Sequence, residues 1–539
     1  MRRDHSETQQ CLPGFETPFQ THLDPDNRWV KLATCIPWDH FGNNYYQQMS
    51  CLGRPEKSAR LVIGAVIIKH KLCLSDRETV AQIQENPYLQ YFVGLNSFQT
   101  EQVFAPSLFV DIRKRMGEQL FEQFQQSIVD TLSKKDKAHN PVAQSSSPDN
   151  ELRGNGSVTH DTDADTKNDD PNDDSAAEPV THQGKLIVDA TVAEQAIRYP
   201  TDLSLLNEAR EISEQLIDCL YPHSTLTKKP RTYRNNARRD FLSLVKQRRP
   251  TGKRLRRGLK QQRQYLRRNL KHIEALLDSM PGQAIPLSHR SLRYYWIIQH
   301  LYAQQEAMYR EKVKRCAHRI VSLHQPHVRP IVRGKANKSV EFGAKLNVSL
   351  DKDGLAHVEE LSWEAYHEGN ALPDLVEAYT HRYGYYPEVV LADPLYGTRD
   401  NRRFLKKKAI RYGGKPLGRP KKITAENRAQ LQAEKRQRQK DYRQRIPIEG
   451  KFGQGKNGYR LNYIRARLAD TSGAWIRSIF LVMNLLVLYE IFIWLRKSVW
   501  WSRFSSACIV NLLLKRLMPF KEERAVELGY SLREGIFAV

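Results

Sequence analysis

The sequence has little cysteine, and its cysteines form no binding or cross-linking motif. Seven occur in 539 residues, at positions 11, 35, 51, 73, 219, 316 and 508, and no two of them make a CxxC pair. This spacing predicts neither a zinc site nor a disulfide framework, and it is typical of a reducing cytoplasm. The opening residues, MRRDHSETQQ, also lack the apolar core of a signal peptide. We therefore expect a cytoplasmic protein.

Long apolar runs are equally scarce. The most apolar stretch is 479–495, IFLVMNLLVLYEIFIWL, and it contains Asn484 and Glu490. This run is short for a membrane span. The sequence thus predicts a buried helix rather than a membrane helix, and no membrane partner.

Acidic residues are too few to balance the basic ones. The chain has 85 lysines and arginines against 60 acids, a formal net charge of +25, and its isoelectric point is near 9.6. Such a charge favours a polyanionic partner, with nucleic acid as the leading candidate. The excess is concentrated in 228–271, where 18 cations accompany one acid, Asp240, and where Tyr233, Phe241 and Tyr265 are interleaved.

Five arginines of this basic segment are candidate DNA contacts. They are Arg254, Arg256, Arg257, Arg267 and Arg268. A surface of this kind neutralises phosphates and makes affinity steeply dependent on salt. A merely solvated helix face is the alternative, but such a face normally carries charges of both signs.

Changes in composition divide the chain into six predicted parts. These are a flexible tail at 1–22, an all-α N-terminal domain for DNA binding or dimerisation at 23–138, a disordered acidic linker at 139–183, an α/β core made of 184–202 and 328–495, a basic helical insertion at 203–327, and a C-terminal extension of unknown role at 496–539.

The N-terminal domain has clear helix signals. Residues 58–72 predict an apolar helix, Ser75 and Glu78 form a capping box for the next helix, and 107–132 predict one long amphipathic helix. Short helices with tight turns are typical of a helix-turn-helix DNA reader and also of a plain bundle used for dimer contacts. No pattern fixes a recognition helix, so both interpretations stay open.

Strand patterns dominate the part after residue 328. VEFGAKLNVSL (340–350) alternates with period two and is followed by a DKDG turn and a returning strand at 355–363, which predicts a β-hairpin. A helix at about 369–382 precedes PEVVLADPLYG (387–397), a predicted buried strand that ends at Asp393.

A second acid occurs in a similar setting further upstream. GKLIVDAT (184–191) is a short apolar strand with Asp189 near its end, and Asp202 is expected to cap the helix that follows. A carboxylate in a buried strand is costly unless it is paired or binds a metal. A strand-end aspartate that caps the following turn is the ordinary alternative.

A third acid belongs to the stretch YRQRIPIEGKFGQGK (442–456). Tyr442, Arg445, Glu449 and Lys456 follow one another at steps of three, four and seven. At about 100° per residue these steps place all four side chains on one helical face. The same steps describe an ordinary salt-bridged helix, and Pro447 argues against a continuous one, since it is suited to begin a new helix.

Together the three acids suggest a metal-dependent site. The predicted order is strand, helical segment, hairpin, helix, strand, helix, and without the helical segment this is the order of a ribonuclease H-like fold. In that fold Asp189, Asp393 and Glu449 would meet. Three acids in one small site need a cation, and two Mg²⁺ or Mn²⁺ ions would drive displacement at phosphorus. We predict an α/β ribonuclease H-like catalytic core with a large helical insertion between its first and second strands, and no nucleotide cofactor.

These residues resemble those of DDE-class transposases of bacterial insertion sequences, in the insertion-sequence four and five groups. The family signature Tyr-x2-Arg-x3-Glu-x6-Lys is matched in full by Tyr442, Arg445, Glu449 and Lys456. The resemblance covers roughly 40–138 and 184–490. It also rests on the stretches ARLVIGAVIIKHKLCLSDRETVAQIQENPYLQYFVGL, VDATVAEQAIRYPTD, VRPIVRGKANKSVEFGAKLNVSL, PEVVLADPLYGTRDNRRF and IPIEGKFGQGKNGY.

The resemblance implies a site and a reaction. The catalytic, metal-binding triad falls on Asp189, Asp393 and Glu449, and Tyr442, Arg445 and Lys456 would hold DNA phosphates near the cut end. The expected protein is a cut-and-paste transposase that binds terminal inverted repeats and target DNA as a homodimer, in the bacterial cytoplasm at the nucleoid. The acidic linker is longer than expected for the family, and the tail after 497 matches no part of it.

Two other classes of protein use similar features. One is an inverted-repeat-binding protein or repressor without catalysis, which would use the same basic surfaces. The other is a host ribonuclease H-like nuclease or Holliday-junction resolvase, which would keep the acids. Intact acids at all three positions argue against the first, and the full DNA-end signature argues against the second.

Overall fold

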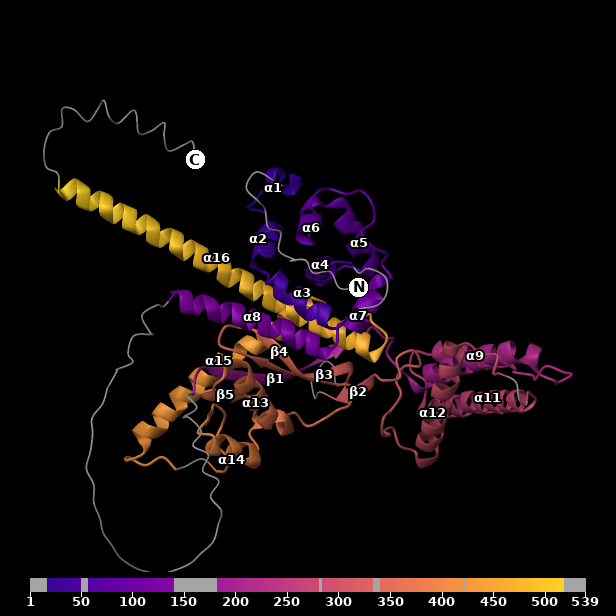
Figure 1. The fold of residues 1–539 in the computed structure, drawn as a ribbon. Helices are drawn as coiled ribbons and strands as arrows, with labels where there is room; N and C mark the ends of the chain where they lie inside the picture. The colour runs from indigo at the N-terminus through magenta and orange to yellow at the C-terminus, as the bar shows by residue number, and fades with distance from the viewer. Residues whose placement is uncertain are drawn as a thin grey trace, which may run out of the picture.

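The computed structural model describes residues 17–49, 57–139, 182–280, 284–332, 340–419 and 422–517, and of 135–139 and 495–517 only the backbone is described. Most of the predicted linker, most of the predicted tail and the end of the predicted C-terminal extension lie outside these residues. The chain forms a central sheet with a helical domain on one side of it and a helical arm extending from it (Figure 1).

A mixed six-stranded sheet forms the centre of the molecule. Its strands are β1 (Lys185–Glu194), β2 (Arg329–Val332), β3 (Val340–Leu350), β4 (Ala356–Ser362), β5 (Val389–Ala392) and β6 (Arg411–Tyr412). Their order is β2-β3-β1-β5-β6, and β4 pairs with β3. β1 is antiparallel to β3 and parallel to β5. The predicted hairpin is confirmed as β3 and β4.

Both faces of the sheet are covered, as a buried sheet requires. On one face Ile187, Leu346 and Val348 pack with Ile448 and Phe480 from the last two helices, α15 (Arg428–Gly458) and α16 (Ala469–Leu517). The other face is covered by α13 (Leu372–Tyr383) and α14 (Arg399–Lys407). Each fully buried Leu or Ile contributes about 1.5–3 kcal/mol to folding. The alternation seen in 340–350 is therefore the pattern of a strand with one apolar face toward α15 and α16.

The N-terminal region is a helical domain built around one central helix. It contains α1 (Pro18–His22), α2 (Arg28–Cys35), α3 (Trp38–Gln47), α4 (Ala59–Lys71), α5 (Asp76–Glu85), α6 (Pro87–Phe92), α7 (Leu108–Arg115) and α8 (Glu118–His139). Residues 59–70 of α4 are all buried. A recognition helix must present a face to DNA, so α4 is not one.

Two sequence predictions for this domain have different outcomes. The capping box at Ser75 and Glu78 is confirmed at the start of α5. The single helix predicted over 107–132 is wrong, because the chain forms α7 and α8, with Met116 and Gly117 between them. Glycine at the junction costs helix stability, and Met116 leaves the helical conformation.

The helix α16 joins the N-terminal domain to the sheet. Leu481, Val482 and Leu485 belong to the core of the N-terminal domain, while Ile479 and Met483 belong to the core under the sheet. By length and composition, Ala469–Trp494 is apolar enough to cross a membrane, with a mean hydropathy of 2.0. Since its two sides fill two protein cores, it is a buried core helix over this part, as predicted. Its backbone continues to Leu517.

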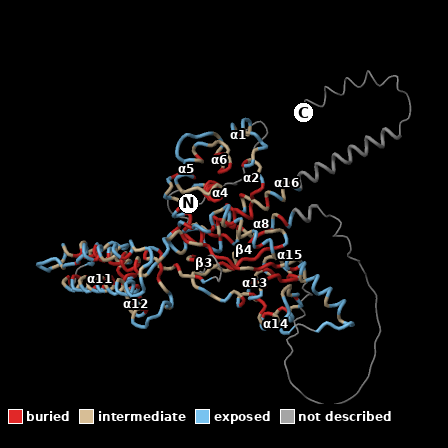
Figure 2. Tube along the Cα trace, turned by 180° about the vertical axis from the view of Figure 1, so that it is seen from behind, coloured by how far each residue is buried: buried red, intermediate tan, exposed pale blue. Residues whose placement is uncertain are grey.

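Four helices between β1 and β2 form the arm. They are α9 (Asp202–Leu220), α10 (Arg234–Val245), α11 (Gly252–Asp278) and α12 (His289–Glu311). Leucines and isoleucines of α9, α11 and α12 make a separate core, and the outer faces are exposed (Figure 2). Thr201, rather than the predicted Asp202, caps α9, because its hydroxyl accepts the Ser204 amide while Asp202 accepts from Arg319 at 2.7 Å.

Candidate active site

Two of the predicted carboxylates lie side by side because β1 and β5 are parallel. Val188 pairs with Ala392 in their register, so the next residues on the two strands are Asp189 and Asp393. β5 ends at Ala392 while β1 continues to Glu194, which leaves Asp189 without a strand neighbour on that side. The acids therefore lie at the carboxyl end of β5, and ligands of α/β sheets bind at the carboxyl ends of the strands.

Each aspartate also makes a local backbone contact. Asp189 Oδ1 accepts the amide of Ala190 at 2.8 Å, and Asp393 Oδ1 accepts the amide of Leu395 at 3.1 Å. Asp393 thereby caps the short helix η4 (Pro394–Tyr396). The capping alternative raised for Asp189 is wrong, because Asp189 lies inside β1 and caps no turn, whereas Asp393 does act as a cap. The second oxygen of each carboxylate is not used in these bonds.

The third acid is presented by α15, which passes through Pro447 without a break. The prediction that Pro447 begins a new helix is wrong. Proline removes one backbone donor and leaves the carbonyl of Arg443, one turn earlier, without its helical partner. Arg443 and Pro447 are both exposed, so water can satisfy that carbonyl. The next residue, Ile448, is fully buried under the sheet and fixes the rotation of the helix. Glu449 consequently lies at the edge of the packed face.

Arg445 connects the first and third acids. Its Nη1 lies 3.2 Å from Asp189 Oδ2, and its Nη2 lies 2.6 Å from Glu449 Oε1. The Tyr442 ring stands 5.8 Å from the Arg445 guanidinium and its side chain is largely exposed. The structure therefore brings Tyr442, Arg445 and Glu449 together near Asp189. Their spacing in the sequence predicts that they share one face of a helix.

Lys456 has a different neighbour. Its Nζ lies 3.9 Å from Glu341 Oε1, on the first part of β3. It occupies the same side of α15 about two turns beyond Glu449. The structure does not place Lys456 in contact with the aspartates.

Electrostatics around Asp189 favour a cation. Burial raises the pKa of its carboxyl, as do the neighbouring charges of Asp393 and Glu368, while the Ala190 amide and Arg445 lower it. In the described part of the chain, no three Asp, Glu, His or Cys side chains converge closely enough to hold a metal as placed. The guanidinium of Arg445 lies between two of the acids instead. Carboxylate oxygens are nonetheless the donors that Mg²⁺ and Mn²⁺ prefer, so the donor chemistry fits such ions.

A buried polar pair on the strand next to Asp189 was not predicted from the sequence. The fully buried Tyr396 donates its hydroxyl to Asn347 Oδ1 at 2.7 Å. Asn401 holds the neighbouring loops together, because its Nδ2 donates to the carbonyls of Gly369 at 2.5 Å and Tyr396 at 2.9 Å. No local signal in the sequence marks Asn347, because the strand alternates polar and apolar residues and Asn347 is one of its polar positions, with Glu341, Lys345 and Ser349.

The five candidate arginines of α11 lie on two sides of that helix. Arg254, Arg256, Arg257 and Arg267 are exposed. Arg256 stacks at 4.6 Å on Tyr309 of α12, whereas Arg268 is partly buried and stacks at 4.7 Å on Tyr233. The interleaved aromatic residue Tyr233 therefore holds an arginine within the arm.

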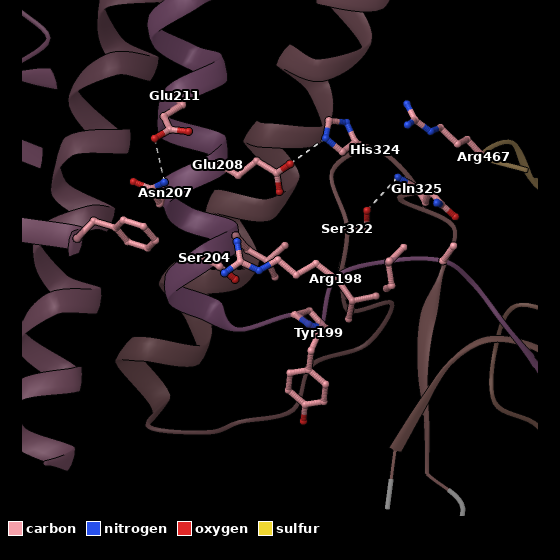
Figure 3. A pocket seen from close by; sticks show the side chains of 16 residues that line it. Arg198, Tyr199, Ser204, Asn207, Glu208, Glu211, Ser322, His324, Gln325 and Arg467 are labelled. Atoms are coloured by element: carbon pink, nitrogen blue, oxygen red, sulfur yellow. Dashed lines mark hydrogen bonds and ion pairs between the residues drawn. The ribbon is translucent and has the colours of Figure 1, made fainter. Parts of the chain in front are cut away.

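A cavity of about 380 Å³ lies at the junction of the arm and the core (Figure 3). Arg198, Tyr199 and Arg467 line it together with α9, and Glu208 pairs across it with His324 at 2.9 Å. The three candidate carboxylates do not line this cavity.

Comparison with known proteins gives two family matches. Residues 390–486 match a transposase DDE domain, and residues 17–115 match a transposase domain of the DUF772 family. The first match contains Asp393 and Glu449, and Asp189 precedes it. It implies a ribonuclease H-like core.

One curated relative is similar to part of the chain. It is the uncharacterized protein ORF8 in the nfe locus of Rhizobium meliloti, 34% identical over 116 residues, which are 22% of this chain and 56% of that protein. The chain thus spans about half the length of this relative. No solved structure was found to match. The two family matches, one at each end of the described fold, support an insertion-sequence transposase of the DDE family.

Proposed function

We propose that this chain is a cut-and-paste DNA transposase of the insertion-sequence four and five groups. It would bind the terminal inverted repeats of its element, cleave the DNA there and join the freed ends to target DNA. The observation that supports this most is the position of Asp189 on β1 beside Asp393 at the end of β5, with Glu449 tied to Asp189 through Arg445.

The three carboxylates are proposed to hold two Mg²⁺ or Mn²⁺ ions. Bound there, the ions supply an activated water and neutralise charge at phosphorus. Asp189 and Asp393 stand on the rigid sheet, and Glu449 stands on a helix anchored by Ile448. Such rigid supports suit a reaction that depends on alignment of attacking and leaving oxygens.

Two displacements at phosphorus make up the proposed reaction. In the first, water oxygen bonds to phosphorus and the bond to the 3′ oxygen at the element's end breaks. The water proton is lost and the 3′ oxygen is protonated, which leaves a 3′-OH and a 5′-phosphate. In the second, that 3′-OH attacks a target phosphorus and displaces a target 3′ oxygen. Each step replaces one phosphorus–oxygen bond by another.

Basic side chains are proposed to hold the DNA. Tyr442, Arg445 and Lys456 lie along α15 and would contact phosphates near the cut end. The arginines of α11 would contact the repeat further away, because they lie on the separate arm (Figure 1). They are Arg254, Arg256, Arg257, Arg267 and Arg268. We propose segments 184–202 and 328–495 as the catalytic core, 203–327 as its insertion and 23–138 as the DNA-binding or dimerisation domain.

Joining two ends requires two active sites near each other, so we propose a homodimer on DNA in the cytoplasm.

The test of the proposed function is cleavage of a labelled DNA fragment that contains the ends flanking the chain's own gene, with Mg²⁺ or with EDTA. Wild type is expected to nick at the ends only with Mg²⁺, and Asp393→Asn and Glu449→Gln are expected to bind the DNA without nicking it. Glu434→Gln, at an exposed acid on the same helix, is the matched control. Full cleavage by Glu449→Gln would refute the assignment, and binding without cleavage by the wild type would favour a repressor.

A further inference from the structure

A fourth carboxylate, Glu368, lies close to the candidate site. It opens the short helix η3 (Glu368–Ala371), which leads into α13. Its side chain is only 16% exposed and pairs with Lys345 of β3 at 2.8 Å. The predicted triad does not include it.

The neighbouring backbone fixes Glu368 next to the loop that follows Asp393. A Cβ at Gly369 would lie 2.5 Å from the carbonyl oxygen of Leu395, so the two segments are in direct contact. Asn401 bonds the carbonyls of Gly369 and Tyr396 together. The backbone next to Glu368 is therefore joined to the turn that follows Asp393.

A buried, unsatisfied donor lies on the strand next to Asp189, because Asn347 of β3 pairs with Ala190 of β1. The Nδ2 of Asn347 is fully buried and has no hydrogen-bond partner among the residues that the structure describes. Its Oδ1 accepts the hydroxyl of Tyr396, whose phenol pKa is raised by burial and by the nearby charges of Glu368 and Asp189. An orphaned donor of this kind is normally satisfied by an ordered water or ligand.

We propose that Glu368 is a fourth acidic member of the metal site, binding an ion directly or through an ordered water that also accepts from Asn347. This inference rests on the proposed function. Lys345 then neutralises Glu368 in the metal-free protein, as Arg445 neutralises Asp189 and Glu449. Arg445 and Lys345 are thus the cations that a bound divalent ion would replace at these carboxylates.

Metal affinity tests this without relying on catalysis. Mn²⁺ is titrated into the metal-free full-length protein without DNA, by calorimetry or electron paramagnetic resonance. Glu368→Gln is expected to weaken Mn²⁺ binding about tenfold or more. Lys345→Met is expected to tighten it, because the competing cation is gone while the carboxylate remains. Glu377→Gln, which breaks a longer and more exposed lysine–glutamate pair with Lys408 at 3.4 Å, should leave the affinity unchanged.

The opposite changes in Mn²⁺ affinity expected for the two variants distinguish a metal ligand from a structural ion pair. Both Glu368→Gln and Lys345→Met break the pair, so a purely structural role predicts the same direction of change in both, and that result would overturn the proposal. If Glu368→Gln does not fold, an unchanged or weaker Mn²⁺ affinity in Lys345→Met overturns it alone. If Asp393→Asn weakens binding and Glu368→Gln does not, Glu368 is wrongly assigned and the proposed function stands. If neither changes binding, the proposed metal site itself falls.

Discussion

Replacing Arg445 by glutamine should destabilise the metal-free protein and make it respond more strongly to metal. The guanidinium bonds Asp189 at 3.2 Å, with both side chains less than a fifth exposed. A hydrogen bond to a charged group contributes about 1.5–3 kcal/mol. The bond to Glu449 adds at most about 1 kcal/mol, because that carboxylate is half exposed and screened. We expect Arg445→Gln to lower the free energy of unfolding by about 2–3 kcal/mol at neutral pH without metal.

The loss should depend on pH in a defined direction. Arg445 lowers the pKa of Asp189, so its removal raises that already elevated pKa further. A carboxyl with a raised pKa in the folded state binds more protons there than in the unfolded chain, and stability falls as pH rises through that range. The variant should therefore lose more stability than the wild type as pH rises from about 4 through the range in which Asp189 loses its proton.

The assay is thermal and urea unfolding of the full chain at several pH values, with and without Mg²⁺. Added Mg²⁺ should stabilise Arg445→Gln more than the wild type, because no guanidinium competes for the carboxylates. Arg443→Gln, at an exposed arginine two residues earlier on α15, is the control and should behave like the wild type. Equal stability of Arg445→Gln and wild type without metal, or equal stabilisation by Mg²⁺, would refute the reasoning.

Three further outcomes can be measured. Asp76→Ala should lower the free energy of unfolding by about 3 kcal/mol, because Asp76 pairs with both Lys69 at 2.8 Å and Arg113 at 2.9 Å. Urea unfolding measures this, and a loss below about 1 kcal/mol would contradict it. Neutralising Arg254, Arg256 and Arg257 together should lower the slope of log affinity for DNA against log salt by about 2–3, and an unchanged slope would remove α11 from the interface. Burial raises the pKa of Asp351 to about 6, so the stability of the wild type should fall as pH rises from about 4 to 6. In unfolding measured at several pH values, Asp351→Asn should show a smaller fall. An equal dependence of stability on pH in the two proteins would show that Asp351 does not titrate in this range.

Local patterns were enough to predict most elements of the fold. The alternation of 340–350 predicts β3 because only one face of that strand packs against α15 and α16. The capping box at Ser75 and Glu78 predicts the start of α5 because both bonds form within four residues. Signals of this kind depend on near neighbours and survive in the tertiary structure.

Features that depend on distant contacts could not be predicted in this way. Pro447 stays within α15 because exposure satisfies the freed carbonyl and Ile448 anchors the helix under the sheet. The joint core of α16 and the N-terminal domain brings together residues far apart in the sequence. The sequence indicates that 479–495 is buried, but not against which partner.

The candidate site shows the same division. The spacing of Tyr442, Arg445 and Glu449 predicts that they share a helical face, and they do. No spacing predicts that Arg445 reaches Asp189, because that contact depends on how α15 crosses β1. Glu368 was missed for the same reason, since only the contact of η3 with η4 brings it to the site.

Arg445 has two possible partners, and they compete. In the metal-free chain it neutralises Asp189 and Glu449, while in the proposed reaction it holds a DNA phosphate. A guanidinium bound to phosphate leaves both carboxylates uncompensated, and burial of Asp189 makes that state costly unless a divalent ion replaces the lost charge. DNA binding and metal binding must then favour each other by equal free energies, because coupling between two ligands is reciprocal. An acidic site inside a chain of net charge +25 would in this way bind metal more tightly when a DNA end is present.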